Sequence, residues 1–98
     1  MAKPHFMEVL EKGDPQLLEQ VSSLREFAGA EGALPAKVKT LMTLLADAML
    51  GHPEGVRVLA EMARAQGATE QEIAETVRMA LLCGGLPALV TATCAFPE

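Results

Sequence analysis

Hydrophobic residues recur along this chain at steps of three and four, which is the period of an amphipathic helix. After Asp14-Pro15 five apolar residues keep this spacing: Leu17, Leu18, Val21, Leu24 and Phe27. An Asp followed by Pro favours a helix start, because the carboxylate caps free N–H groups and proline suits the first turn. The pattern predicts a helix over 15–28, preceded by a shorter one over 5–12.

A second helical stretch opens at Leu34-Pro35 and runs to about Leu50. The face predicted to be buried carries five large apolar residues: Leu34, Val38, Leu41, Leu45 and Met49. Gly51 ends this helix, and Pro53 suits the first turn of the next, which stops at Gly67.

Thr69-Glu70-Gln71-Glu72 has the spacing of a capping box, in which Thr and Glu each satisfy a free N–H group. It predicts a helix that ends at Gly84-Gly85, and Leu86-Pro87 begins a last apolar piece to about Phe96. No segment alternates convincingly as a strand does. We therefore predict an all-α fold of about six helices, in a single domain over residues 1–98.

The composition limits the kinds of partner that we expect for this chain. The net charge is −5, and the eight Lys and Arg residues are spread singly, so we expect no nucleic acid to bind. We also expect no membrane span and, because the first residues lack an apolar signal core, a cytoplasmic location. Half of the 98 residues are hydrophobic, which predicts that another subunit covers part of the surface.

Two cysteines, Cys83 and Cys94, stand too far apart for a Cys-x-x-Cys redox pair or for a common metal-ligand spacing. Apolar neighbours flank both, so we predict two reduced, buried side chains. Four methionines, at positions 42, 49, 62 and 79, are predicted to fill gaps in the core. We expect no metal and no cofactor.

Two quoted stretches, "GALPAKVKTLMTLLADAML" and "ARAQGATEQEIAETVRMALLCGGLPAL", resemble the carboxymuconolactone decarboxylase family, which includes alkyl hydroperoxidase D-type proteins. Their "LPAK-x-K" and "GAT-x-x-EI" motifs carry the resemblance together, and it spans nearly the whole chain. It implies an all-helical fold and a homo-oligomer, a trimer or a hexamer, with pockets at the subunit contacts.

The resemblance also locates a redox site that this chain has lost. Peroxidase-type members use Glu-x11-Cys-x2-Cys-x3-His, and the aligned positions here are Thr40, His52, Gly55 and Leu59. A thiol peroxidase needs a sulfur that is oxidised and then resolved, so the substitutions argue against that activity. Decarboxylase-type members tend to keep the His where Leu59 stands, so the resemblance does not carry their activity over either.

Four residues remain as a candidate pocket: Thr40, Asp47, His52 and Glu54. His52 could act as a general base near neutral pH, or it could be a solvated residue of a loop. Glu54 stands in the predicted first turn of a helix, where a negative charge interacts favourably with the helix dipole. This interaction explains the residue without a catalytic role. Asp47 could form an acid–base pair with His52, or it could face solvent or a neighbouring subunit.

The leading hypothesis is a thiol-free family member that binds a small organic acid or performs weak acid–base chemistry on it. One alternative is a non-catalytic scaffold or partner-binding subunit whose pocket is filled by side chains. A second alternative is an active lactone decarboxylase, so the sequence leaves open whether the protein is an enzyme.

Overall fold

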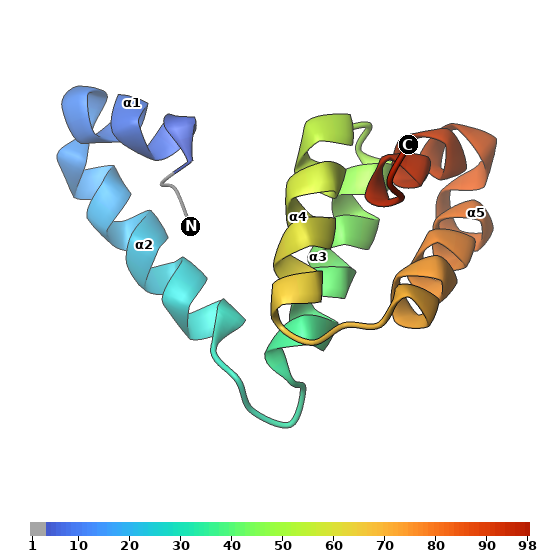
Figure 1. Ribbon diagram of the computed structural model, residues 1–98. Helices are drawn as coiled ribbons and strands as arrows, with labels where there is room; N and C mark the ends of the chain where they lie inside the picture. Colours follow the sequence, from blue (N-terminus) through green and yellow to red (C-terminus); the bar gives the residue numbers. More distant parts are fainter. Residues whose placement is uncertain (1–3) are drawn as a thin grey trace. The chain divides into compact units, whose positions relative to one another are not determined.

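The computed structural model describes residues 4–98, which contain five α-helices, a short 3₁₀ turn and no strand (Figure 1). The chain forms two compact units that divide after Ala30. The first unit holds α1 (His5–Gly13) and α2 (Pro15–Gly29). The second holds α3 (Ala36–Met49), α4 (Pro53–Ala65), α5 (Glu70–Ala92) and η1 (Thr93–Ala95). The predicted all-α class is confirmed.

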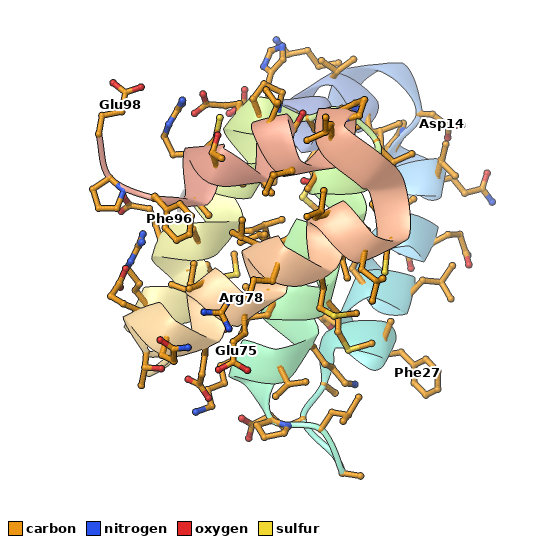
Figure 2. All side chains as sticks on the ribbon, turned by 90° about the vertical axis from the view of Figure 1, so that its right-hand side faces the viewer. Asp14, Phe27, Glu75, Arg78, Phe96 and Glu98 are labelled. Atoms are coloured by element: carbon orange, nitrogen blue, oxygen red, sulfur yellow. The ribbon has the colours of Figure 1, made fainter. Side chains whose placement is uncertain are left out.

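The first unit is a pair of helices without a buried core. Asp14 separates them and caps α2, its Oδ1 accepting a hydrogen bond from the Leu17 N–H at 3.0 Å. Across the pair, the Arg25 guanidinium lies 5.6 Å from the centre of the Phe6 ring. Neither helix contains a buried residue, and Phe27 projects outward with 83% of its surface exposed (Figure 2).

The core belongs to the second unit, where α3 packs against both α4 and α5. Its largest fully buried side chains are Leu44, Val56 and Ile73, one from each of the three helices. Most other core positions are alanines, which let the helix axes approach closely: Ala48, Ala60, Ala63, Ala80, Ala88 and Ala92. This packing fixes where α3 ends and α4 begins.

The buried face of α3 differs from the prediction. Its buried residues are Thr40, Leu44 and Ala48, at i, i+4 and i+8, whereas Met49 and Leu34 are exposed. Leu41 and Leu45 are partly buried beside that stripe. The prediction was wrong for Leu34 and Met49, because α4 and α5 approach the neighbouring stripe, which includes Thr40 and Ala48 and not only large apolar side chains.

α5 is kinked where the sequence predicts a break. Gly85 has φ 77° and ψ −169°, a conformation open essentially to glycine alone, and Pro87 begins the helical turn beyond it. Gly84 also serves packing, because a Cβ there would lie 2.6 Å from the Ala88 Cβ and 3.2 Å from the Met49 Cγ. At the other end, Thr69 and Glu72 form the predicted capping box.

α5 qualifies the expectation that nothing spans a membrane. Residues 79–97 carry no charged side chain, and Glu70–Ala95 is long and apolar enough to cross a membrane on length and composition alone. One such helix is weak evidence, and the uncharged helical part, residues 79–92, rises only about 21 Å, short of the ~30 Å hydrocarbon core. The absence of a membrane span stays a prediction.

The predicted burial of the sulfur-containing residues is largely wrong. Cys83 is exposed on α5, Cys94 is partly buried in η1, and both thiols are free. Three of the four methionines, Met42, Met49 and Met79, are exposed, and only Met62 is partly buried. The outer faces of the second unit therefore carry much of the apolar content that the sequence pattern assigned to the core.

Candidate functional site

The turn between α3 and α4 brings together two of the four candidate residues, Asp47 and His52. The Nδ1 atom of His52 lies 3.7 Å from Oδ1 of Asp47. The backbone supports this arrangement, since the His52 N–H donates to the Asp47 carbonyl at 2.9 Å. Asp47 keeps 26% of its side chain exposed and His52 keeps 62%, so the pair is open to a small molecule.

Gly55, in the first turn of α4, makes room for the Asp47 carboxylate. A Cβ at this position would lie 2.1 Å from Oδ2 of Asp47 and 3.1 Å from its Cγ. The carboxylate therefore rests directly against the start of α4, where unpaired N–H groups favour negative charge. The lack of a side chain at Gly55 thus leaves room for the contact between Asp47 and His52, at a position where the resemblance expects a cysteine.

The other two candidates lie apart from the pair. Thr40 stands two turns back along α3, where it is buried and donates a hydrogen bond to Gln66 Oε1 at 2.7 Å. Glu54 is exposed and pairs with Arg57, three residues further on. The structure thus joins Asp47 and His52 but does not gather all four residues into one pocket.

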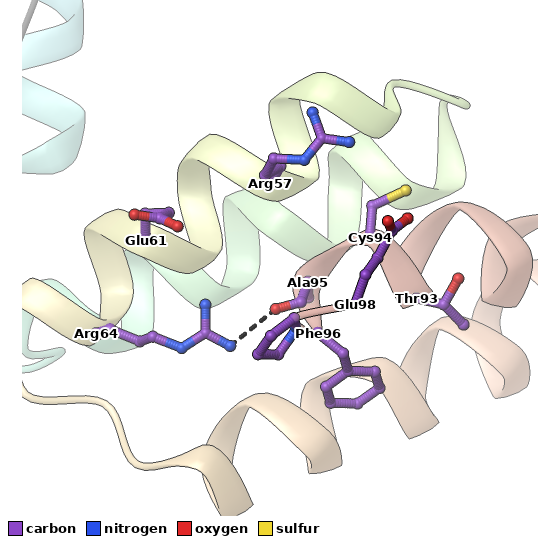
Figure 3. Close-up of a pocket in the computed structure, with 9 residues that line it drawn as sticks. Arg57, Glu61, Arg64, Thr93, Cys94, Ala95, Phe96 and Glu98 are labelled. Carbon is purple, nitrogen blue, oxygen red and sulfur yellow. Dashed lines mark hydrogen bonds between the residues drawn. The ribbon is translucent and has the colours of Figure 1, made fainter.

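A different cavity opens along α4, where residues 93–98 fold back over the helix (Figure 3). We call it the α4 hollow. It has a volume of about 580 Å³, and α4 lines it with Arg57, Glu61 and Arg64. The opposite wall consists of Thr93, Cys94, Ala95, Phe96, Pro97 and Glu98. None of the four candidate residues lines it.

Arg64 fixes one wall of the α4 hollow. Its guanidinium donates to both carboxylate oxygens of Glu70, at 2.7 and 2.9 Å, and to the Ala95 carbonyl at 2.8 Å (Figure 3). This pairing raises the pKa of Arg64 and lowers the pKa of Glu70 below its usual range. The guanidinium is therefore committed to holding η1 against α4 and the start of α5.

Glu72 is also held ionised at the start of α5. The Thr69 backbone N–H donates to its carboxylate at 2.8 Å, and Lys37 of α3 approaches to 3.0 Å. The hydrogen bond from Thr69, followed by the one from Lys37, lowers the pKa of Glu72. Two glutamates thus tie the first turn of α5 to α3 and α4.

The sequence showed only part of the α4 hollow. Arg57, Glu61 and Arg64 follow one another at helical spacing, so a shared face of α4 could have been read from the pattern. What covers that face depends on the kink at Gly85 and the turn of η1, which return residues 93–98 to α4. No short-range pattern in the sequence predicts this contact between residues 93–98 and α4.

Metal-ligating side chains do not gather within residues 4–98: no three of the His, Cys, Asp and Glu residues in that range could hold one ion together. The expectation of no metal and no cofactor stays a prediction.

Comparison with known proteins places most of the chain in one family. The model of the carboxymuconolactone decarboxylase family matches residues 15–97. The chain is also similar to the uncharacterised protein MJ1511 of Methanocaldococcus jannaschii, at 27% identity over 92 residues, covering 94% of this chain and 86% of that protein. No solved structure matches the chain.

Proposed function

Because the chain belongs to the carboxymuconolactone decarboxylase family, we propose that it binds a small organic acid and moves a proton on it without thiol chemistry. The observation that carries the proposal is the Asp47–His52 contact at the α3–α4 turn. The family resemblance puts the thiol pair of the peroxidase-type members at this turn. Here it presents an imidazole and a carboxylate instead.

The geometry suggests a role for each side chain. The Nδ1 atom of His52 faces Asp47, which leaves Nε2 toward solvent to accept or donate a proton. In this proposal the Asp47 carboxylate, whose Oδ1 lies 3.7 Å from Nδ1, is the partner on the protein side of the ring. Gly55 keeps this carboxylate against the start of α4. The pair is thus a general acid–base group accessible to a small ligand.

Thiol peroxidase chemistry is not part of this proposal. Cys83 belongs to α5 and Cys94 to η1, so neither is part of the α3–α4 turn itself, and both are free. We expect no reduction of alkyl hydroperoxides with a dithiol donor. Peroxide reduction that disappears in Cys83→Ser would contradict the proposal.

A direct test screens small carboxylic acids and carboxylated lactones for proton exchange or carbon dioxide release. We expect activity that falls at least tenfold in His52→Ala and less in Asp47→Asn, since the asparagine keeps the shape but not the charge. Gln71→Ala, on an exposed position of α5, is the matched control. Activity unchanged in His52→Ala would refute the acid–base role.

The alternatives from the sequence remain, and one has an observation in its favour. Leu59, at the position of the family's histidine, packs against the core, which suits a scaffold or partner-binding subunit. That alternative predicts no turnover and no small acid bound. An active lactone decarboxylase instead predicts carbon dioxide release from carboxymuconolactone that depends on His52.

A further inference from the structure

We propose that the α4 hollow is a binding site for a small carboxylic acid, with the Arg57 guanidinium holding the carboxylate. The inference rests on the proposed function only for the class of ligand, and it places that ligand at a second site, because none of the four candidate residues lines the hollow. No Lys or Arg stands among those four residues, so a permanent cation that can bind a carboxylate has to come from elsewhere in the chain.

Two arginines line the hollow, but only one of them can serve a ligand. Arg64 already donates to both oxygens of Glu70 and to the Ala95 carbonyl. A ligand could bind Arg64 only by replacing hydrogen bonds that hold η1 and the start of α5 against α4. Arg57 pairs with Glu54 in an exposed i, i+3 contact on the same helix. Such exposed pairs contribute little to stability, so a carboxylate can replace Glu54 at low cost.

The remaining walls suit the body of a small acid. Ala95, Phe96 and Pro97 are apolar residues among those that line the hollow. Glu61 and Glu98 border the same space and oppose negative charge, so they disfavour ligands with several negative groups. A volume of about 580 Å³ falls in the range of small-molecule pockets. Together these features favour a monocarboxylate with a compact apolar body.

The reactivity of Cys94 can report whether a ligand occupies the hollow. It lines the cavity, whereas Cys83 is exposed on α5 and does not, so alkylation of the two thiols can be compared within one molecule. Benzoate is the probe, and benzamide is its uncharged isostere. We expect benzoate to slow the modification of Cys94 by iodoacetamide severalfold, while Cys83 reacts at an unchanged rate. Mass spectrometry measures the rate at each cysteine. For the same protection, benzamide should require at least a tenfold higher concentration.

Variants separate the roles of the charges. Arg57→Ala should raise the benzoate concentration needed for half-maximal protection about tenfold or more, because a charge-assisted contact is lost. Glu54→Gln should strengthen it by freeing Arg57, and Arg78→Ala, an exposed arginine of α5 outside the hollow, should leave it unchanged. Helical circular dichroism confirms the fold of each variant.

Three results would overturn the inference: no protection of Cys94 by saturating benzoate, equal protection by benzamide, or equal protection in Arg57→Ala. The test also separates this inference from the proposed function. Protection that persists in the wild type without any His52-dependent turnover refutes the proposed function alone. Turnover that depends on His52 without Cys94 protection refutes the site in the α4 hollow alone.

Discussion

At the residue scale, the contact between Asp47 and Gly55 defines the candidate site. The absence of a side chain at Gly55 lets the carboxylate lie against the start of α4 and reach His52. Helix starts attract negative charge through their unpaired N–H groups, so this arrangement has a physical basis beyond packing. The glycine is therefore as much part of the site as the two ionisable residues.

Gly55→Ala tests this role. The new Cβ would fall 2.1 Å from Oδ2 of Asp47, so the carboxylate must rotate away and lose its contact with His52. Alanine is up to about 1 kcal/mol better than glycine inside a helix, which offsets the local strain and keeps the fold intact. We expect a stability change within about 1 kcal/mol, with at least tenfold less His52-dependent activity. Gly29→Ala, with open space around its Cβ position, is the control for urea unfolding and activity.

At the element scale, α5 is defined by its two ends and its kink. The capping box at Thr69 satisfies two N–H groups, and Glu70 and Glu72 connect the same turn to α4 and α3. Gly85 then redirects the chain, so that the segment beyond it returns toward α4. Each feature makes a separate prediction.

Thr69→Ala removes the N-cap hydroxyl that accepts the Glu72 N–H at 3.0 Å. We expect a loss of about 1 kcal/mol in the free energy of unfolding, measured by urea titration. The control is Thr43→Ala, because that exposed hydroxyl bonds only to the Lys39 carbonyl of its own helix. Equal losses in the two variants would argue against the cap.

The two glutamates predict a dependence on acid pH. Their pKa values are lowered in the folded state, so their contribution to stability is complete above the usual glutamate range, near pH 4 to 5. It is lost as the pH falls through the lowered values. We expect the urea midpoint of the wild type to drop more between pH 6 and pH 3 than that of a Glu70→Gln, Glu72→Gln double variant. Parallel drops in the two proteins would contradict this.

Gly85→Ala should destabilise the second unit. With φ 77° and ψ −169°, an alanine at this position costs about 1–3 kcal/mol of backbone strain. Thermal unfolding measures the loss, with Gly13→Ala as a control that meets open space and has no positive φ. Unchanged stability in Gly85→Ala would show that the kink can be straightened at no cost.

At the scale of the whole molecule, exposed apolar residues argue for a covering partner. Leu82 lies before the kink at Gly85, Leu86 and Val90 lie after it, and each of the three residues is at least 66% exposed. Single chains seldom expose large apolar patches to water. We propose that a second copy of the chain covers these residues in a homo-oligomer.

Light scattering with size-exclusion chromatography checks the assembly. We expect a trimer or a hexamer for the wild type, and a smaller species for a Leu82→Glu, Leu86→Glu double variant, because burying two new charges is costly. Gln71→Glu adds a charge at an exposed position near the start of α5 and should leave the mass unchanged. A monomeric wild type at micromolar concentration would refute the proposal.

The success of the sequence-based predictions followed the range of the interactions. Helix starts at Pro15 and after Thr69 were predictable, because capping depends on neighbours within four residues. The buried face of α3 was not, because Thr40 and Ala48 are buried by the approach of other helices. In the candidate site, the turn brings Asp47 and His52 together over five residues, whereas the α4 hollow depends on a return over some thirty residues.

The tie between Arg64 and the Ala95 carbonyl spans 31 positions of the chain and anchors a stretch that has no charge of its own between Met79 and Pro97. Ion pairing cannot guide that stretch into place, so its final turn depends on the burial of Ala92 and Ala95 and on the hydrogen bond from the Arg64 guanidinium, which also binds Glu70. We therefore expect a substitution of Arg64 to displace Cys94 and Phe96 first, although both residues lie far from it in the sequence.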